Sequence, residues 1–285
     1  MDRNIVILAG GASSRMKPSV AGLDPSLQFD AATKAKAMMR VGRNQRPFLD
    51  YLLLNVEQSG YEDVVIVVGD KDTSIRNYYE VEGHCRDFPG MRISYIPQAT
   101  PLGKEKPLGT ADALLQALKP MIAWKGRRVT VCNSDNLYSE NALRLLLEDA
   151  HENAMIDYDR SALGVDDERI SKWAVIVKDE QGYLRDIVEK PSLEEIGRAK
   201  DENGRVGVSM NIWRFSCDSI LPFLESVPLH PVRAEKELPT AVRMMVSTHQ
   251  QMLYAIPLSE QVLDLTSQRD VTAVVEYLKV RYPHF

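Results

Sequence analysis

Short apolar runs rich in β-branched residues alternate with longer amphipathic segments along the first half of the chain. The runs expected to form buried strands are residues 5–8, 64–68, 93–96 and 129–132. Helical spacing of apolar residues occurs between them, at residues 47–59 and 111–118. A strand that is apolar at every position is typical of a sheet covered by helices on both faces. The alternation therefore predicts a mostly parallel, doubly wound sheet whose ligands bind at the carboxyl ends of the strands.

The second half of the chain has a pattern that predicts antiparallel pairing. Residues 173–178 and 183–188 have the pattern of a hairpin with Gly182 in its turn. Further strands are expected at 206–215 and 252–256, and further helices at 234–246 and 268–280. No internal repeat or clean linker divides the chain. We therefore predict one domain over residues 1–285, a three-layer α/β/α fold with a doubly wound mixed sheet, whose two halves meet near residue 135.

Composition and charge narrow the class of protein. The chain has 285 residues, of which 44% are hydrophobic and 26% charged, as in an average globular protein. Its net charge of −5 leaves no overall positive field to hold a nucleic-acid backbone. The three cysteines are odd in number and far apart, which argues against a disulfide framework. No apolar run reaches the roughly 20 residues that span a bilayer. Since no signal peptide is recognised either, we expect a cytoplasmic protein with no membrane or nucleic-acid partner.

The segment LAGGASSRM, residues 8–16, follows the first strand and is the first candidate for chemistry. Gly10 and Gly11 allow the backbone to approach a ligand closely, and Arg15 adds a permanent charge suited to phosphate. The spacing matches neither GxxxxGK[ST] nor GxGxxG, which excludes a P-loop and a dinucleotide fingerprint. A phosphate-binding turn is predicted, with a plain strand-to-helix turn as the alternative.

Two further segments carry groups that suit an anionic ligand. Lys34 and Lys36 lie between the glycine turn and the first helix, where they belong either to a solvated loop or to the phosphate site. Gly109 allows close approach before the helix at 111–118, and Thr110 can cap that helix. Asp112 in the first turn suits the helix dipole as well as it suits a ligand.

Acidic and basic residues follow two strands of the predicted sheet. Asp135 comes just after the strand at 129–132, where a carboxylate opposite a phosphate turn is the expected ligand of Mg²⁺. Glu189 and Lys190 end the hairpin and can bind hydroxyls and phosphate. Ser192 and Glu195 have the spacing of a capping box, so a helix is expected to start there.

Taken in order, these motifs resemble the nucleotidyltransferase family that makes nucleotide sugars. The segments that carry the resemblance are LAGGASSRM, KAMMRVG, GTADAL, CNSDN, VEKP and SMNIWRF. The similarity runs from Ile5 to about Tyr277. It implies the nucleotide-diphospho-sugar transferase fold and an Mg²⁺-dependent enzyme that condenses an NTP with a sugar 1-phosphate to give an NDP-sugar and pyrophosphate. It also implies a nucleotide-binding half, about 1–135, and a sugar-binding half, about 136–285.

The resemblance assigns a role to each matching residue. The catalytic residues that grip the triphosphate would be Arg15 and Lys36. The nucleotide-binding residues would be Leu8, Gly10, Gly11, Gln98, Gly109 and Thr110. The sugar phosphate would be bound by Glu189, Lys190 and Asn211, and the metal by Asp135 and Asp264. Gln98 resembles the glutamine that reads the uracil or thymine edge, which favours UTP or dTTP.

The chain departs from the family pattern in three places. The segment before Lys36 is long, so Lys34 competes for its role. Ala12, Ser13 and Ser14 replace a further glycine, a form closer to cytidylyltransferases. Thr240 stands where members often place the second metal-binding aspartate, for which Asp264 is the candidate substitute.

Two alternatives to the leading interpretation stay open. One is a CTP-dependent cytidylyltransferase of a phosphorylated alcohol such as phosphocholine. The other, suggested by Thr240, is a non-catalytic nucleotide-sugar-binding regulatory protein. A homo-oligomer is compatible with either interpretation.

Overall fold

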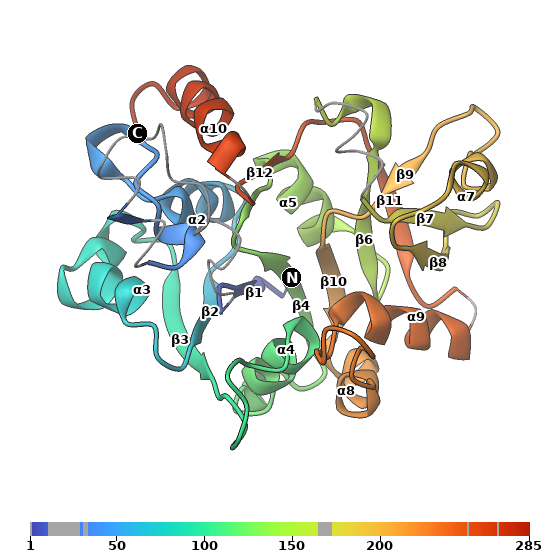
Figure 1. The fold of residues 1–285 in the computed structure, drawn as a ribbon, viewed down its shortest axis with the longest axis horizontal. Helices are drawn as coiled ribbons and strands as arrows, with labels where there is room; N and C mark the ends of the chain where they lie inside the picture. Colours follow the sequence, from blue (N-terminus) through green and yellow to red (C-terminus); the bar gives the residue numbers. More distant parts are fainter. Residues whose placement is uncertain (1, 11–28, 31–33, 165–172, 250, 267) are drawn as a thin grey trace.

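A mixed sheet of ten strands runs through the molecule (Figure 1). The computed structural model describes residues 2–10, 29–30, 34–164, 173–249, 251–266 and 268–285. The strand order is β3-β2-β1-β4-β10-β6-β9-β7-β8, and β11 pairs with β6. A separate two-stranded ribbon pairs β12 with β5.

The first half of the sheet is parallel, as predicted. Its strands are β1 (Asn4–Leu8), β2 (Asp63–Gly69), β3 (Arg92–Gln98) and β4 (Arg128–Asn133). Ile7 of β1 lies opposite Ile66 of β2 and Cys132 of β4. Every residue of β1 is buried, because helices cover both faces of the sheet at its centre.

The second half of the sheet is mainly antiparallel. Its strands are β6 (Ala154–Asp159), β7 (Val175–Lys178), β8 (Leu184–Val188), β9 (Gly207–Val208), β10 (Ile212–Ser216) and β11 (Tyr254–Leu258). β10 joins the two halves, since it runs antiparallel to β4 on one side and to β6 on the other. The predicted hairpin is confirmed as β7 and β8, and Gly182 in its turn has a φ of +87°.

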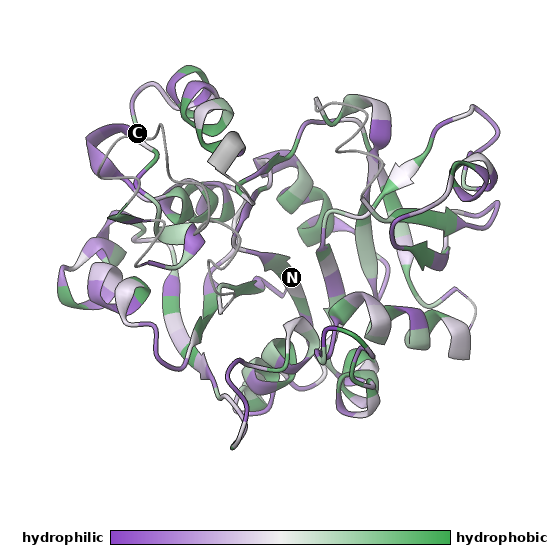
Figure 2. Ribbon diagram, in the orientation of Figure 1, coloured by the Kyte–Doolittle hydropathy of each residue, from purple (hydrophilic) through white to green (hydrophobic). Residues whose placement is uncertain are grey.

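Helices form a layer on each face of the sheet (Figure 1). One layer holds α2 (Phe48–Gln58), α5 (Glu140–Glu148) and α10 (Gln268–Arg281). The other holds α4 (Thr110–Leu118), α8 (Cys217–Ser226) and α9 (Leu238–Thr248). β1 contributes to both cores, because Ile5 and Ile7 face the first layer while Val6 and Leu8 face the second. Figure 2 shows the hydrophobic residues concentrated on the central strands and on the helix faces that cover them.

The described chain also contains several short helical segments. They are α3 (Ser74–Arg76), α7 (Leu193–Arg198), and the single turns Lys36–Met38, Arg43–Gln45, Asn77–Val81, His84–Asp87, Ile122–Trp124 and Arg160–Ala162. The predicted capping box at the start of α7 is confirmed, with Ser192 and Glu195 bonded reciprocally. No helix within the described residues is long and apolar enough to cross a membrane.

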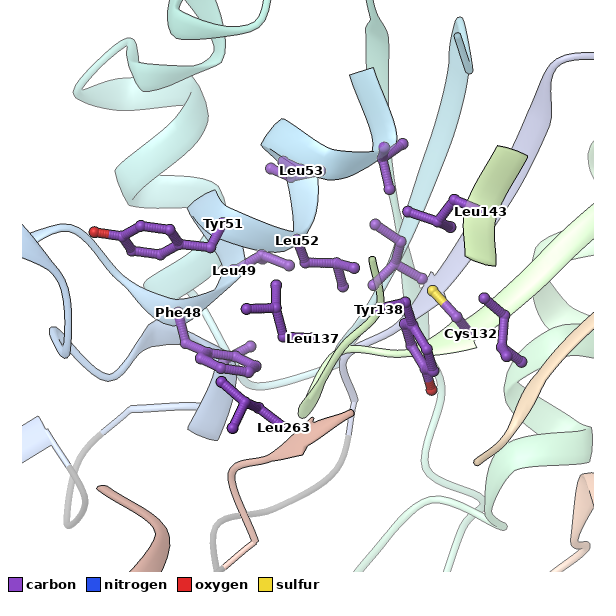
Figure 3. Packing of buried hydrophobic residues seen from close by; sticks show 14 of the residues in the cluster. Phe48, Leu49, Tyr51, Leu52, Leu53, Cys132, Leu137, Tyr138, Leu143 and Leu263 are labelled. Carbon is purple, nitrogen blue, oxygen red and sulfur yellow. The ribbon is translucent and has the colours of Figure 1, made fainter. Parts of the chain in front are cut away.

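The two-stranded ribbon is built by β5 (Asn136–Leu137) and β12 (Leu263–Asp264). Leu137 lies opposite Leu263, and both pack beside Phe48 of α2 in the first core (Figure 3). Burial of these leucines anchors the ribbon and fixes its register. Asp264, which follows Leu263, is thereby brought to the end of β4, where Asp135 lies.

Several sequence predictions need correction. The strand expected at 206–215 is two strands, because Asn211 adopts a left-handed φ of 55° between β9 and β10. The helix expected from residue 234 begins at Leu238, with Pro239 in its first turn. Three further elements, α5, β6 and α8, were not predicted from the sequence. The cap of α5 was visible in the sequence, since the Ser139 side chain accepts from the amide of Ala142.

Candidate functional site

Lys36 lies at the carboxyl end of β4. Its Nζ is 3.3 Å from Oδ2 of Asp135, and the two side chains are 10% and 28% exposed. Lys34 points elsewhere and pairs with Asp30, at 3.0 Å. The structure therefore distinguishes the two lysines and places Lys36 beside the candidate metal ligand.

The backbone that carries Lys36 is fixed by a buried carboxylate. Asp30 accepts from Nε of Arg40 at 2.7 Å, from Nη2 at 2.9 Å and from the Arg40 amide at 3.1 Å. Burial alone would raise the pKa of Asp30, but the hydrogen bonds from Arg40 and Lys34 outweigh it and lower the pKa. Met38 and Met39 are buried in the first core. The turn at Lys36 is thus held by the hydrogen bonds between Asp30 and Arg40 and by the burial of Met38 and Met39.

Asp264 joins Asp135 through the ribbon. Asp264 lies opposite Asn136, and the amide of Leu265 donates to the carbonyl of Asp135 at 2.8 Å. The hydroxyl of Thr266 donates to Oδ1 of Asp264. This pairing gives the site two neighbouring acidic residues.

The acidic pair suits Mg²⁺ better than a metal that needs a full protein cage. Within the described residues, no group of three or more His, Cys, Asp or Glu side chains could hold a metal. Mg²⁺ is commonly held by one or two carboxylates together with substrate phosphates and water, so Asp135 and Asp264 fit it. Thr240 lies on α9, which covers the opposite face of the sheet from the ribbon. The fold therefore places Asp264, and not Thr240, near Asp135.

The residues predicted to bind the nucleotide converge beside the end of β1. Leu8 ends this strand and is buried, and Gly10 follows it. Gln98 ends β3, and its Oε1 lies only 3.1 Å from where a side chain on Gly10 would begin. Gly11 and Arg15 lie outside the described residues.

Gly109 and Thr110 hold the start of α4 against the start of α9. Gly109 has a φ of +100°, and a Cβ there would lie 2.8 Å from the carbonyl oxygen of Lys236. The hydroxyl of Thr110 accepts from the amide of Leu238 at 2.9 Å. Thr110 was expected to cap its own helix; it instead satisfies the first amide of α9, because the two helices begin side by side.

The sugar-side residues lie where β8 ends. Glu189 pairs with Nη2 of Arg233 at 2.8 Å, and Nη1 of the same arginine pairs with Glu237 at 2.9 Å. Burial raises the pKa of Glu237, and the charge of nearby Glu189 adds to this effect. Lys190 has a left-handed φ of 48°. Arg233 was not predicted from the sequence, in which only the surrounding charge pattern offered a signal for it.

Asn211 is tied to the metal side of the site by Tyr138. The hydroxyl of this buried tyrosine lies 2.7 Å from the carbonyl of Met210 and 3.2 Å from that of Asn211. Tyr138 directly follows β5 and packs beside Cys132 in the first core (Figure 3). A non-glycine residue keeps a positive φ only where its surroundings hold it there, and the hydrogen bonds from Tyr138 supply part of that constraint.

The structure therefore brings the predicted residues together in groups. Lys36 lies beside Asp135, and Asp264 lies on the strand that pairs with the residue after Asp135. Gln98 lies beside Gly10 and bonds to Gly109. Glu189 pairs with Arg233, which was not among the predicted residues. A pocket of about 640 Å³ lies elsewhere, between α2, α5 and α10, and none of the predicted site residues lines it.

Comparisons with known proteins agree with the fold and the motifs. The family model for nucleotidyl transferases matches residues 4–265. A glucose-1-phosphate adenylyltransferase of Koribacter versatilis (strain Ellin345) is 26% identical over 221 residues, which cover 77% of this chain and 49% of that protein. The bifunctional protein GlmU of Staphylococcus carnosus (strain TM300) is 24% identical over 246 residues, covering 86% and 45%. The chain spans about half the length of the curated relatives it matches.

Solved structures share the whole fold. A UDP-glucose pyrophosphorylase complexed with UDP-glucose superposes with a TM-score of 0.70 at 18% identity, covering 99% of this chain and 100% of that one. The UDP-glucose pyrophosphorylase of Acinetobacter baumannii gives a TM-score of 0.72 at 18% identity, covering 100% and 95%. These matches confirm the predicted mixed α/β/α fold. The family model spans nearly the entire sheet and both candidate acidic residues, and the chain belongs to the nucleotidyl transferase family.

Proposed function

We propose that this protein is an enzyme that condenses an NTP with a sugar 1-phosphate, giving an NDP-sugar and pyrophosphate. The observation that carries the proposal is the juxtaposition of Lys36, Asp135 and Asp264 at the carboxyl end of β4. Relatives in the family include glucose-1-phosphate adenylyltransferases, and the structural neighbours include UDP-glucose pyrophosphorylases. The fold and motif order agree with that chemistry.

The reaction needs no nucleophile from the protein, because an oxygen of the sugar phosphate attacks the α-phosphorus and pyrophosphate leaves. Catalysis of such a transfer rests on holding two anions in line and neutralising charge. Lys36, nearly buried and held against Asp135, is a preorganised cation for that charge. We assign Mg²⁺ to Asp135 and Asp264, where the bound ion would neutralise phosphate charge. Arg15 would add a second cation.

We assign the nucleotide to Leu8, Gly10, Gly11, Gln98 and Gly109, and the sugar phosphate to Glu189, Lys190 and Asn211. The division into halves near residue 135 follows from these assignments. For the base we propose uracil or thymine, since the carboxamide oxygen of Gln98 can accept from the N3–H of either base. Thr110 fits the nucleotide side as a support for the loop rather than as a ligand.

The experiment that tests the proposal is release of pyrophosphate in the presence of Mg²⁺. UTP, dTTP, CTP, GTP and ATP are each combined with several sugar 1-phosphates and with phosphocholine. Turnover with UTP or dTTP and a sugar 1-phosphate is expected. Turnover with CTP and phosphocholine alone would establish the cytidylyltransferase alternative. No turnover, together with thermal stabilisation by a nucleotide sugar, would establish the regulatory alternative.

A cytoplasmic location and the absence of a nucleic-acid partner stay predictions from the sequence, and a homo-oligomeric state is compatible with the proposed function.

A further inference from the structure

The carboxamide of Gln98 is held in one orientation by its neighbours. Its Nε2 donates to the carbonyl of Gly109 at 2.9 Å and to Oδ2 of Asp112 at 2.9 Å. A carboxamide nitrogen has two hydrogens, so both are used within the protein. The reverse orientation would place Oε1 against two acceptors in a buried position, which is strongly unfavourable.

Asp112 is itself held as an acceptor by Gln116. The amide of Ala99 donates to Oε1 of Gln116 at 2.8 Å, which fixes the orientation of that side chain. The Nε2 of Gln116 therefore faces Oδ2 of Asp112, at 2.7 Å. One carboxylate oxygen thus accepts from both glutamines, and Asp112 is 8% exposed. The three side chains form a chain of hydrogen bonds that starts at a fixed backbone amide.

The end of this chain is an oxygen beside Gly10. Gln98 Oε1 lies 3.1 Å from the ideal Cβ position of Gly10, and no donor in the described part of the protein bonds to it. Gln98 therefore offers an acceptor, and only an acceptor, toward the place where the base is proposed to bind.

We propose that Asp112 and Gln116 are positioning residues that select uracil or thymine against cytosine. The inference rests on the proposed function, because it takes Gln98 as the residue that meets the base. Uracil and thymine carry a hydrogen on N3, which Oε1 accepts. Cytosine carries a lone pair on N3, and two acceptors then face each other. A carboxamide that was free to rotate would donate its NH₂ to cytosine, so the discrimination comes from the two neighbours and not from Gln98 alone.

Two substitutions at one position separate the hydrogen bond from the charge. Asp112→Leu removes the accepting oxygen, whereas Asp112→Asn keeps an oxygen at the Oδ2 position because both glutamines donate there. The measurement is kcat/KM for UTP, dTTP and CTP with one sugar 1-phosphate. For Asp112→Leu we expect the preference for UTP over CTP to fall about tenfold, within the discrimination that a base-edge contact supplies. Asp112→Asn should keep most of the preference, and kcat with UTP should change little in either variant.

Gln116→Leu tests the same chain without touching the residue that contacts Gln98. It should lower the preference less than Asp112→Leu does, since Gly109 and Asp112 still accept from Gln98. Melting temperatures show whether each variant is folded. If Asp112→Leu is not folded, the preference of Gln116→Leu for UTP over CTP provides the test. An unchanged preference in the folded variants, or an equal loss in Asp112→Asn and Asp112→Leu, would overturn the inference.

The outcome can be separated from that of the proposed function. If the wild-type protein turns over an NTP but prefers CTP or ATP, nucleotidyl transfer stands and the base selection is wrong. If the wild-type protein shows no turnover, calorimetric Kd values for UTP and CTP in wild type and Asp112→Leu still measure the preference. Equal Kd values for UTP and CTP in the wild-type protein would then contradict the inference directly.

Discussion

The nucleotide side and the sugar side of the candidate site are held in different ways. On the nucleotide side, Gln98 and Gly109 are fixed by buried hydrogen bonds and by close packing against Lys236. On the sugar side, Glu189 is held by an ion pair with Arg233 in which both side chains are more than 40% exposed. Lys190 and Asn211 adopt left-handed backbone conformations. The nucleotide side is therefore held by hydrogen bonds of buried groups, whereas Glu189 on the sugar side is held by an exposed ion pair.

The difference has a physical origin in the sheet. Gln98 and Asp112 are buried among the parallel strands and the helices that cover them, so their polar groups need partners within the protein. Glu189 and Lys190, which follow β8 in the second half, are exposed, so water can serve as the partner of their polar groups. We therefore expect substitutions on the metal side to affect the rate strongly, substitutions around Gln98 to affect mainly the choice of nucleotide, and substitutions on the sugar side to affect mainly the KM of the sugar phosphate.

The largest effect is expected at the ion pair between Lys36 and Asp135. Lys36→Ala should lower kcat by about 10²- to 10³-fold, by analogy with the loss of one preorganised donor. Asp135→Ala should have an effect of similar size, measured by pyrophosphate release. Lys34→Ala is the matched control, because Lys34 pairs with Asp30 instead. Near wild-type rates in Lys36→Ala would show that this lysine is not at the reacting phosphates.

A smaller effect is expected at the second carboxylate. Asp264→Asn removes a charge from the proposed ligand of Mg²⁺, so the Mg²⁺ concentration for half-maximal rate should rise, by about tenfold or more. Thr240→Asp should leave the rate unchanged, since Thr240 lies on α9 and its amide is bonded within that helix turn to Glu237. A large gain in rate from Thr240→Asp would reverse the assignment of the two positions.

Arg233→Met tests the sugar side. An exposed ion pair contributes little, about 0.2–1 kcal/mol, so the KM for the sugar phosphate should rise by no more than about fivefold while kcat is retained. Lys279→Met is a control, because it breaks an exposed ion pair with Glu276 on α10. A drop of 10²-fold in kcat for Arg233→Met would place this arginine among the catalytic residues and remove the contrast between the two sides.

The smallest effect on turnover is expected at Asp30, where the change is in stability. Asp30→Asn weakens buried bonds to Arg40 and should lower the free energy of unfolding by about 1–3 kcal/mol at neutral pH. The pKa of Asp30 is lowered in the fold, so its stabilising contribution is complete above the ordinary value of 3.8 and is lost as the pH falls through the folded-state pKa. Urea unfolding of both proteins from pH 6 to pH 3 should show the difference shrinking at low pH. A difference that stays constant would contradict this account.

The sequence alone was enough to predict the elements whose residue pattern is local. The parallel strands β1 to β4, the hairpin of β7 and β8, and the capping box at Ser192 all depend on neighbouring residues. The sequence alone was not enough to predict contacts between side chains that lie far apart in the chain. Arg233 meets Glu189 from a distant loop, and Thr110 meets the amide of Leu238, because helices that begin side by side share partners.

The sequence by itself determined the family, the mixed α/β/α fold and the residue types available for chemistry, since apolar periodicity and motif order are local properties of the chain. Only the tertiary structure decided which of Lys34 and Lys36 faces Asp135, and that Asp264 rather than Thr240 adjoins it. It also decided the orientation of Gln98. Each of these choices depends on pairing between residues far apart in sequence, and such pairing is fixed by burial and hydrogen bonding in the folded chain rather than by local preference.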